Sequence, residues 1–134
     1  MEENTKFPAK LVIDASTVLN FLMPDEDTPS YVDSIFAAIK ENRIEAYAPD
    51  LLPYEISNSL KSAIKSRRLS VIRARKIVKS FLNLGVVFEQ VDFLKTFVYA
   101  VKHDLSSYDA SYLYLAKKHK AKLYSFDKKL AGLT

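Results

Sequence analysis

The sequence predicts an α/β fold in which helices flank a parallel sheet of four to five strands. Short runs of branched apolar residues, typical of strands buried on both faces, alternate with segments of helical periodicity. Such alternation favours parallel strands joined by right-handed crossovers. The chain has 134 residues, of which 49% are hydrophobic, so residues 1–134 are expected to form a single domain with one core.

The composition excludes several classes of protein. The chain has no cysteine, which excludes disulfides and thiolate metal sites, and its two glycines are too few for a Walker or Rossmann nucleotide loop. No apolar run is long enough to span a membrane, and residues 1–10 are too polar for a signal peptide, so we expect a cytoplasmic protein without membrane contact. The net charge of +4 permits a polyanionic partner without requiring one.

The first predicted strand, Leu11–Ile13, runs directly into the carboxylate of Asp14. In a parallel α/β sheet, this places Asp14 at the carboxyl edge, where ligands bind. A helix capped by Ser16 should follow and should end before Pro24. The acidic residues of segment 24–27 are expected to form a solvated loop.

The second helix should begin at Thr28-Pro29, with the threonine as its cap and the proline at its first position. Residues 44–48 are predicted to form the second strand, and Asp50 should cap the helix that follows. Glu55 then lies in or just after the first turn of that helix, near the carboxyl end of the strand. Asn58 comes three residues later and shares a face with Glu55.

Basic residues dominate the next part of the chain, because no acidic residue occurs between Glu55 and Glu89. We expect a helical hairpin here, with Ser70 as the cap of its second helix. Such a surface could contact an RNA backbone or an acidic protein, or it could simply be solvated. The candidate RNA contacts are Arg67, Arg68, Arg73 and Arg75.

A third strand is predicted at residues 86–91, after a helix that Gly85 should end. Asp92 should cap the next helix, which runs to about His103. That helix has four apolar residues at helical spacing: Leu94, Phe97, Val98 and Val101.

A further helix, over residues 108–118, should carry Asp109 in its first turn. Residues 122–126 are predicted to form the fourth strand, and Asp127 follows this strand directly. His119 and His103 are expected to be surface or capping residues, since no spacing of histidines supports a zinc site.

Four acids therefore share one structural position. Asp14 and Asp127 each follow a strand, while Glu55 and Asp109 each open a helix. Strand carboxyl ends and helix N-termini meet at the same edge of a parallel sheet, so the four carboxylates should lie together. They would repel one another unless cations intervene. Oxygen ligands favour Mg²⁺ or Mn²⁺, which suit phosphodiester hydrolysis.

Four segments resemble the PIN-domain ribonucleases, and most closely the VapC-type toxins of prokaryotic toxin–antitoxin pairs. The segments are residues 12–16, 49–60, 105–116 and 123–130. They occur in the family's order and span nearly the whole chain. The Tyr-Asp-Ala-x-Tyr-Leu-x-Leu-Ala run and the Ser-x-Asp-x-x-Leu motif after it are the most specific parts.

This resemblance implies a three-layer PIN-like fold and endonucleolytic RNA cleavage that depends on one or two Mg²⁺ or Mn²⁺ ions. It also implies a homodimer and a cognate antitoxin that covers the active site. By position, the family's four acids match Asp14, Glu55, Asp109 and Asp127. The family's supporting polar positions match Ser16, Asn58 and Ser125, the last of which stands where threonine is frequent. Asp104 is an additional acid that we interpret as a loop or cap residue.

Two other functions are considered. A PIN-like module could bind RNA or protein without cleaving, although the intact set of acids argues against this. A phosphotransfer receiver domain is also small and α/β, but it needs an acid pair after its first strand, where this sequence has only Asp14.

Overall fold

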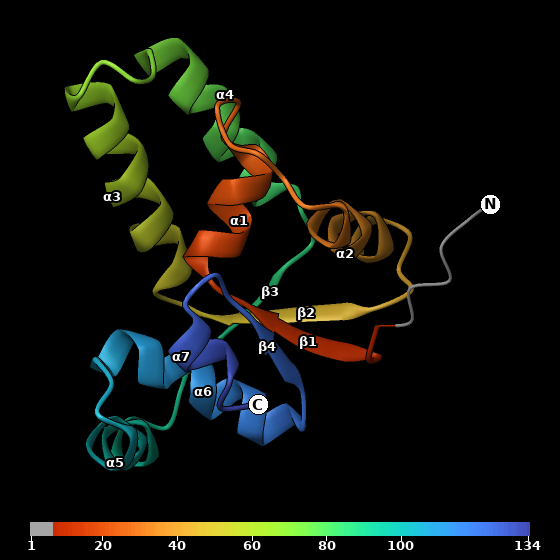
Figure 1. Cartoon of the computed structure of the whole chain (residues 1–134), viewed down its shortest axis with the longest axis vertical. Helices are drawn as coiled ribbons and strands as arrows, with labels where there is room; N and C mark the ends of the chain where they lie inside the picture. The colour runs from red at the N-terminus through yellow and green to blue at the C-terminus, as the bar shows by residue number, and fades with distance from the viewer. Residues whose placement is uncertain (1–6) are drawn as a thin grey trace.

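The computed structural model describes residues 7–134, which form an α/β fold around one parallel sheet (Figure 1). Residues 1–6, which belong to the polar N-terminal segment that argued against a signal peptide, lie outside this range. The strands are β1 (Lys10–Ile13), β2 (Glu45–Pro49), β3 (Val87–Glu89) and β4 (Lys122–Tyr124). The helices are α1 (Ala15–Leu22), α2 (Ser30–Lys40), α3 (Leu52–Lys65), α4 (Val71–Leu82), α5 (Phe93–His103), α6 (Ser107–His119) and α7 (Lys128–Ala131).

The strand order is β3-β2-β1-β4, and all neighbours are parallel, so the prediction of a parallel sheet of at least four strands is confirmed. Strand β1 is central, and Leu11 pairs with Ala46 on one side and with Lys122 on the other. All three residues of Leu11–Ile13 are fully buried. Consecutive residues point to opposite faces of a sheet, so both faces of β1 are covered.

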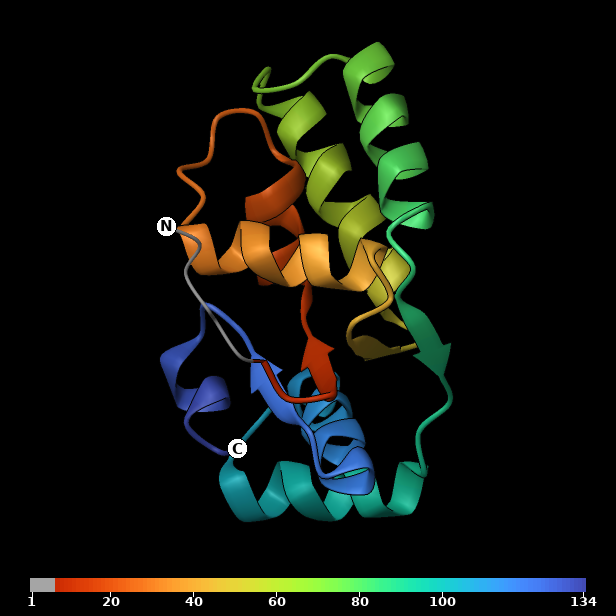
Figure 2. The same cartoon turned by 90° about the vertical axis from the view of Figure 1, so that its right-hand side faces the viewer.

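The helices form two layers on opposite sides of the sheet (Figures 1 and 2). Helices α1 to α4 lie on one side, and α6 and α7 lie on the other. Helix α5 packs on the outside of α6, which is therefore enclosed between the sheet and α5. This position explains why α6 buries residues around most of its circumference, from Ala110 to Ala116.

Several predicted helix starts are wrong by one or two residues. Helix α1 is capped by Asp14 rather than Ser16, because the Asp14 carboxylate accepts a hydrogen bond from the Thr17 backbone N–H at 3.1 Å. Helix α2 has Pro29 at its N-cap, and the hydroxyl of Thr28 donates instead to the Asn20 carbonyl at 2.9 Å.

Helix α3 begins after Leu51, and Asp50 does not cap it. The Asp50 backbone N–H donates to the Glu89 carbonyl at 3.1 Å, so this residue still continues the pairing of β2 with β3. Helix α4 ends at Leu82, and Gly85 lies beyond its C-cap in a turn with φ of 87°. The predicted caps Ser70 and Asp92 are confirmed by hydrogen bonds from backbone N–H groups.

Helix α5 directs an apolar face towards solvent. Its buried side is small and includes Thr96 and Ala100, which pack towards α6. The exposed apolar residues are Phe93, Leu94, Phe97, Val98 and Val101. We call these five residues the α5 face.

Among residues 7–134, none of the helices has both the length and the apolar character that a membrane span requires.

His119, which was expected to be a surface or capping residue, ends α6 with its side chain only 12% exposed. Its ring stacks on Tyr47 at a centroid distance of 3.9 Å, and Nε2 lies 2.9 Å from a carboxylate oxygen of Glu89. Burial alone would raise the pKa of Glu89, but hydrogen bonds from His119 and Lys118 outweigh it and lower that pKa. These contacts tie the end of α6 to strands β2 and β3.

Candidate active site

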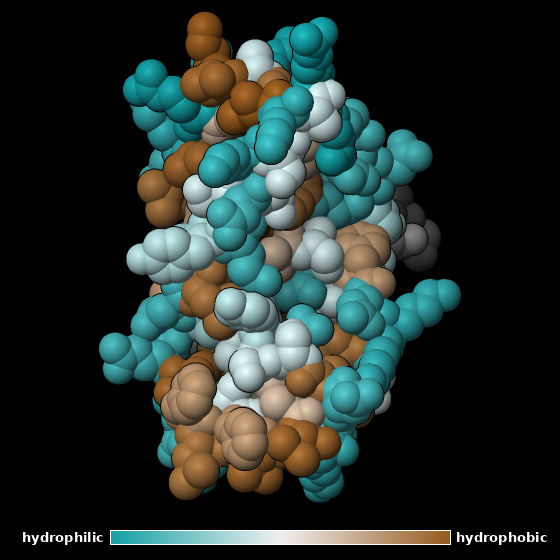
Figure 3. Space-filling model, turned by 90° about the vertical axis from the view of Figure 1, so that its left-hand side faces the viewer, coloured by the Kyte–Doolittle hydropathy of each residue, from teal (hydrophilic) through white to brown (hydrophobic). Residues whose placement is uncertain are grey.

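The four predicted acids lie at the carboxyl edge of the sheet, where helices α1, α3, α6 and α7 begin. Asp14 follows β1, Glu55 lies in the first turn of α3, Asp109 lies in the first turn of α6, and Asp127 caps α7. This edge faces left in Figure 1 and faces the viewer in Figure 3, which shows hydrophilic residues across its middle.

The Asp14 carboxylate accepts more hydrogen bonds than that of any of the other three acids. Only 8% of its surface is exposed, and the Ser16 hydroxyl donates to its Oδ1 at 2.6 Å. The Ser125 hydroxyl donates to Oδ2 at 2.5 Å, across 111 residues of sequence. Ser125 in turn accepts from the backbone N–H of Asp127 at 3.0 Å. Two of the three predicted supporting residues therefore hold Asp14 in place.

Glu55 has a partner that the sequence analysis did not identify. The hydroxyl of Tyr112, which is almost fully buried in α6, donates to Glu55 Oε1 at 2.5 Å. Tyr112 lies three residues after Asp109, so helical spacing places it on the same face as a predicted site residue. This spacing is the feature of the sequence that could have identified Tyr112 as a neighbour of the four acids. Asn58 lies one turn after Glu55, and the two residues line one surface cavity.

Burial raises the pKa of Glu55, the hydrogen bond from Tyr112 lowers it, and the charges of Asp14 and Asp109 raise it further, with a net increase. Burial also raises the pKa of Asp109, helped by the charges of Asp127 and Asp14 and opposed by Ser106 and Lys129. Asp14 thus acts on both Glu55 and Asp109, and Asp127 acts on Asp109. The four carboxylates form one electrostatic group.

The donor chemistry of this group fits a hard divalent cation, since every candidate ligand is an oxygen and the charges repel without a counter-ion. Within residues 7–134, no three acidic or histidine side chains have converged on a single point suited to an ion. Protein donors contact carboxylate oxygens of Asp14, Glu55 and Asp127. Asp127 Oδ1, for example, accepts from the backbone N–H groups of Lys129 and Leu130 at 3.0 and 3.2 Å.

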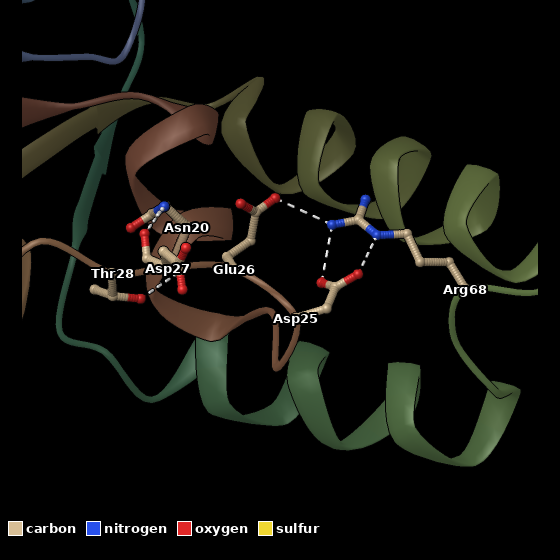
Figure 4. Close-up of polar contacts among 6 residues, drawn as sticks. All are labelled: Asn20, Asp25, Glu26, Asp27, Thr28 and Arg68. Carbon is tan, nitrogen blue, oxygen red and sulfur yellow. Dashed lines mark hydrogen bonds and ion pairs between the residues drawn. The ribbon is translucent and has the colours of Figure 1, made fainter.

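The basic hairpin of α3 and α4 contains an ion pair that changes the interpretation of Arg68. Its Nε lies 2.5 Å from Asp25 Oδ2, and one terminal nitrogen lies 2.9 Å from Asp25 Oδ1 and 3.0 Å from Glu26 Oε1 (Figure 4). The hydrogen bond from Arg68 lowers the pKa of Asp25. Asp25 and Glu26 are exposed, as expected for a solvated acidic loop, but their ion pairs with Arg68 also bind this loop to the hairpin.

Of the other predicted RNA contacts, Arg67 and Arg73 line a shallow surface cavity at the tip of the hairpin, and Arg75 is exposed on α4. Arg67 adopts a left-handed backbone conformation with φ of 60° in the turn between the two helices. These three arginines remain candidates for contact with a phosphate backbone, whereas Arg68 already has carboxylate partners.

Comparison with known proteins agrees with this arrangement. The family model for the PIN domain matches residues 11–133. Ribonuclease VapC3 of Pyrobaculum aerophilum is 30% identical over 126 residues, which cover 91% of this chain and 92% of that protein.

Two solved structures share the fold. The crystal structure of PAE2754 from Pyrobaculum aerophilum superimposes with a TM-score of 0.73 at 24% identity, covering 94% of this chain and 80% of that one. VapC20 of Mycobacterium tuberculosis, a toxin that cleaves the sarcin-ricin loop, gives a TM-score of 0.66 at 16% identity, covering 91% of this chain and 93% of that one. With its sheet order, its edge of four acids and the match over almost its full length, the chain belongs to the PIN-domain family and, within it, to the VapC group.

Proposed function

We propose that this protein is a divalent-metal-dependent endoribonuclease and the toxin of a type II toxin–antitoxin pair. The observation that supports this most directly is the electrostatic group of Asp14, Glu55, Asp109 and Asp127 at the carboxyl edge of a PIN fold. The single domain, the cytoplasmic location and the antitoxin partner are part of the same proposal.

In this proposal the four carboxylates hold one or two Mg²⁺ or Mn²⁺ ions. Such ions lower the pKa of water and stabilise charge on the leaving oxygen during phosphodiester hydrolysis. The Asp14 carboxylate is held in one orientation, because the hydroxyls of Ser16 and Ser125 donate hydrogen bonds to its two oxygens. Tyr112 donates to one oxygen of Glu55 and so fixes the orientation of this carboxylate.

The direct test is cleavage of end-labelled RNA by the purified protein. We expect internal cuts with Mn²⁺ or Mg²⁺, no cuts with excess EDTA, and recovery when Mn²⁺ is restored. Tight RNA binding without cleavage under any of these conditions would instead identify a binding module.

The α5 face supports the homodimer that belongs to this proposal. Its five side chains are 54 to 74% exposed. They present on the order of 500 Å² of apolar surface, so two copies would bury on the order of 1,000 Å², which reaches the range of specific interfaces. A two-fold axis that lies in this interface perpendicular to α5 would pair the helix with its own copy in antiparallel orientation, which is favourable for the helix dipoles. Figure 3 shows the resulting hydrophobic patch at its lower end.

Charges placed on the α5 face should abolish the dimer. In Leu94→Glu/Val101→Glu, two carboxylates per protomer would have to be buried against their copies, so we expect a monomer by light scattering coupled to size exclusion. The matched control is Ile72→Glu/Leu82→Glu, which changes two equally exposed apolar residues of α4. A monomeric wild type at ~50 μM, well above the usual dissociation constants of stable dimers, would refute the assignment, as would a dimeric double variant.

A further inference from the structure

Two exposed tyrosines stand next to the acids, and the established features of the fold do not account for them. Tyr54 directly precedes Glu55 in the first turn of α3, and Tyr108 directly precedes Asp109 in the first turn of α6. Tyr54 is 74% exposed and Tyr108 is 64% exposed. In the part of the chain that the structure describes, neither ring stacks on another aromatic ring.

Both tyrosines line one cavity of about 450 Å³. This volume lies within the range of roughly 300–1,000 Å³ that is typical of pockets for small organic groups. The other lining residues are Ala15, Leu51, Glu55, Asn58 and Ser59. The cavity thus combines apolar walls with an amide, a hydroxyl and one of the four carboxylates.

We propose that Tyr54 and Tyr108 form a receptor for one unpaired nucleobase of the RNA, adjacent to the phosphate that is cut. Aromatic rings bind single-stranded nucleic acid by stacking on bases, and every base offers a π-face for this contact. Glu55 lines the same cavity as both tyrosines, so a base held here would have its own phosphate within reach of that carboxylate.

The lining also indicates how the base would be oriented. Ser59 is exposed on α3 and can donate or accept a hydrogen bond at a base edge. A paired base cannot enter, because stacking on both sides and Watson–Crick pairing already occupy its faces and edge. The receptor therefore selects RNA that is single-stranded or unstacked at the cut. This inference rests on the proposed nuclease function.

The test uses the full-length chain carrying Asp14→Asn, so that the RNA is not cut during measurement. An oligoribonucleotide with 2-aminopurine at one position is titrated, and the label is moved along the strand in successive oligonucleotides. We expect the fluorescence to be quenched by protein at one position only. Tyr54→Ala and Tyr108→Ala should weaken that quenched complex about 5- to 100-fold, the range for loss of one stacked base.

Phenylalanine at either position should retain the quenching, since the ring rather than the hydroxyl makes the contact. Tyr31→Ala is the matched control, because Tyr31 is also exposed but lines a different cavity, beside β4. Placing the 2-aminopurine in a duplex should remove the effect. Quenching that is unchanged in both alanine variants, or lost equally in the phenylalanine variants, would overturn the receptor.

The two proposals can fail separately. If wild type does not cut RNA with Mn²⁺ but quenching depends on Tyr54 and Tyr108, the receptor stands and the nuclease proposal fails. If wild type cuts RNA but the alanine variants quench and cut as wild type does, the nuclease proposal stands and the receptor fails.

Discussion

Asp14→Asn is expected to reduce RNA cleavage on the order of 10³-fold or more, the scale seen when one member of a catalytic set is removed. The amide keeps one oxygen, so it can still accept the hydrogen bond from the Thr17 backbone N–H that begins α1. It loses the negative charge and one of the two oxygens. Initial cleavage rates in saturating Mn²⁺ measure the loss, and circular dichroism with thermal unfolding measures whether the fold persists.

The control for this variant is Asp92→Asn. Asp92 also caps a helix, through a 3.0 Å hydrogen bond from the Lys95 backbone N–H, but it does not belong to the four acids. Cleavage by this control should equal that of wild type. Equal cleavage by Asp14→Asn would remove Asp14 from the catalytic set, whatever the fold of the variant.

Asp109→Asn should stabilise the ion-free protein at pH 7 and destabilise it relative to wild type when Mn²⁺ is present. Burial and the charges of Asp127 and Asp14 raise the pKa of Asp109 above its ordinary 3.8. A carboxyl with a raised pKa favours folding fully below its unfolded pKa, and this contribution is lost as the pH rises through the folded pKa. Removing the charge should therefore increase the free energy of unfolding of the ion-free protein at pH 7.

This gain should shrink as the pH is lowered and should vanish below the ordinary carboxyl range, where Asp109 is neutral in both states. Mn²⁺ at a hundred times its dissociation constant should add about 2.7 kcal/mol to wild type, and less to the variant. Urea unfolding of wild type and variant, with EDTA or with Mn²⁺ and at pH 4 or pH 7, measures the free energy of unfolding under each of these four conditions. Asp33→Asn is the control, because Asp33 is also a first-turn acid but lies on α2. A loss of stability without ions at pH 7 would contradict the electrostatic argument.

The order of elements and the location of the four acids followed from local patterns in the sequence. The apolar run Leu11–Ile13 predicted a strand that is buried on both faces. A parallel sheet brings the ends of strands and the starts of helices to one edge even when their exact boundaries are not known. Ser70 and Asp92 were recognised as caps because each precedes an amphipathic helix. The start of α1 was missed because Ser16 and Asp14 are equally good caps by residue type. The start of α3 was missed because its N-cap is Leu51, a residue type that rarely caps helices, whereas the neighbouring Asp50 is a favoured type.

Contacts between distant residues could not be predicted in this way. Arg68 pairs with Asp25 across 43 residues, and composition alone does not select that pair from the many possible ones. The spacing of Leu94, Phe97 and Val101 identified an apolar face on α5 but not its direction. That face points outwards because α6 already covers the sheet, which leaves α5 in an outer position.

The bond from Ser125 to Asp14 also determines when the catalytic edge can form during synthesis. β1 emerges early from the ribosome, whereas Ser125 follows Asp14 by 111 residues. Because translation adds about 5–20 residues per second, a nascent chain spends several seconds without β4 and without the hydrogen bond from Ser125 to Asp14. The carboxyl edge that carries the four acids can therefore be completed only after nearly all of the chain has been synthesised.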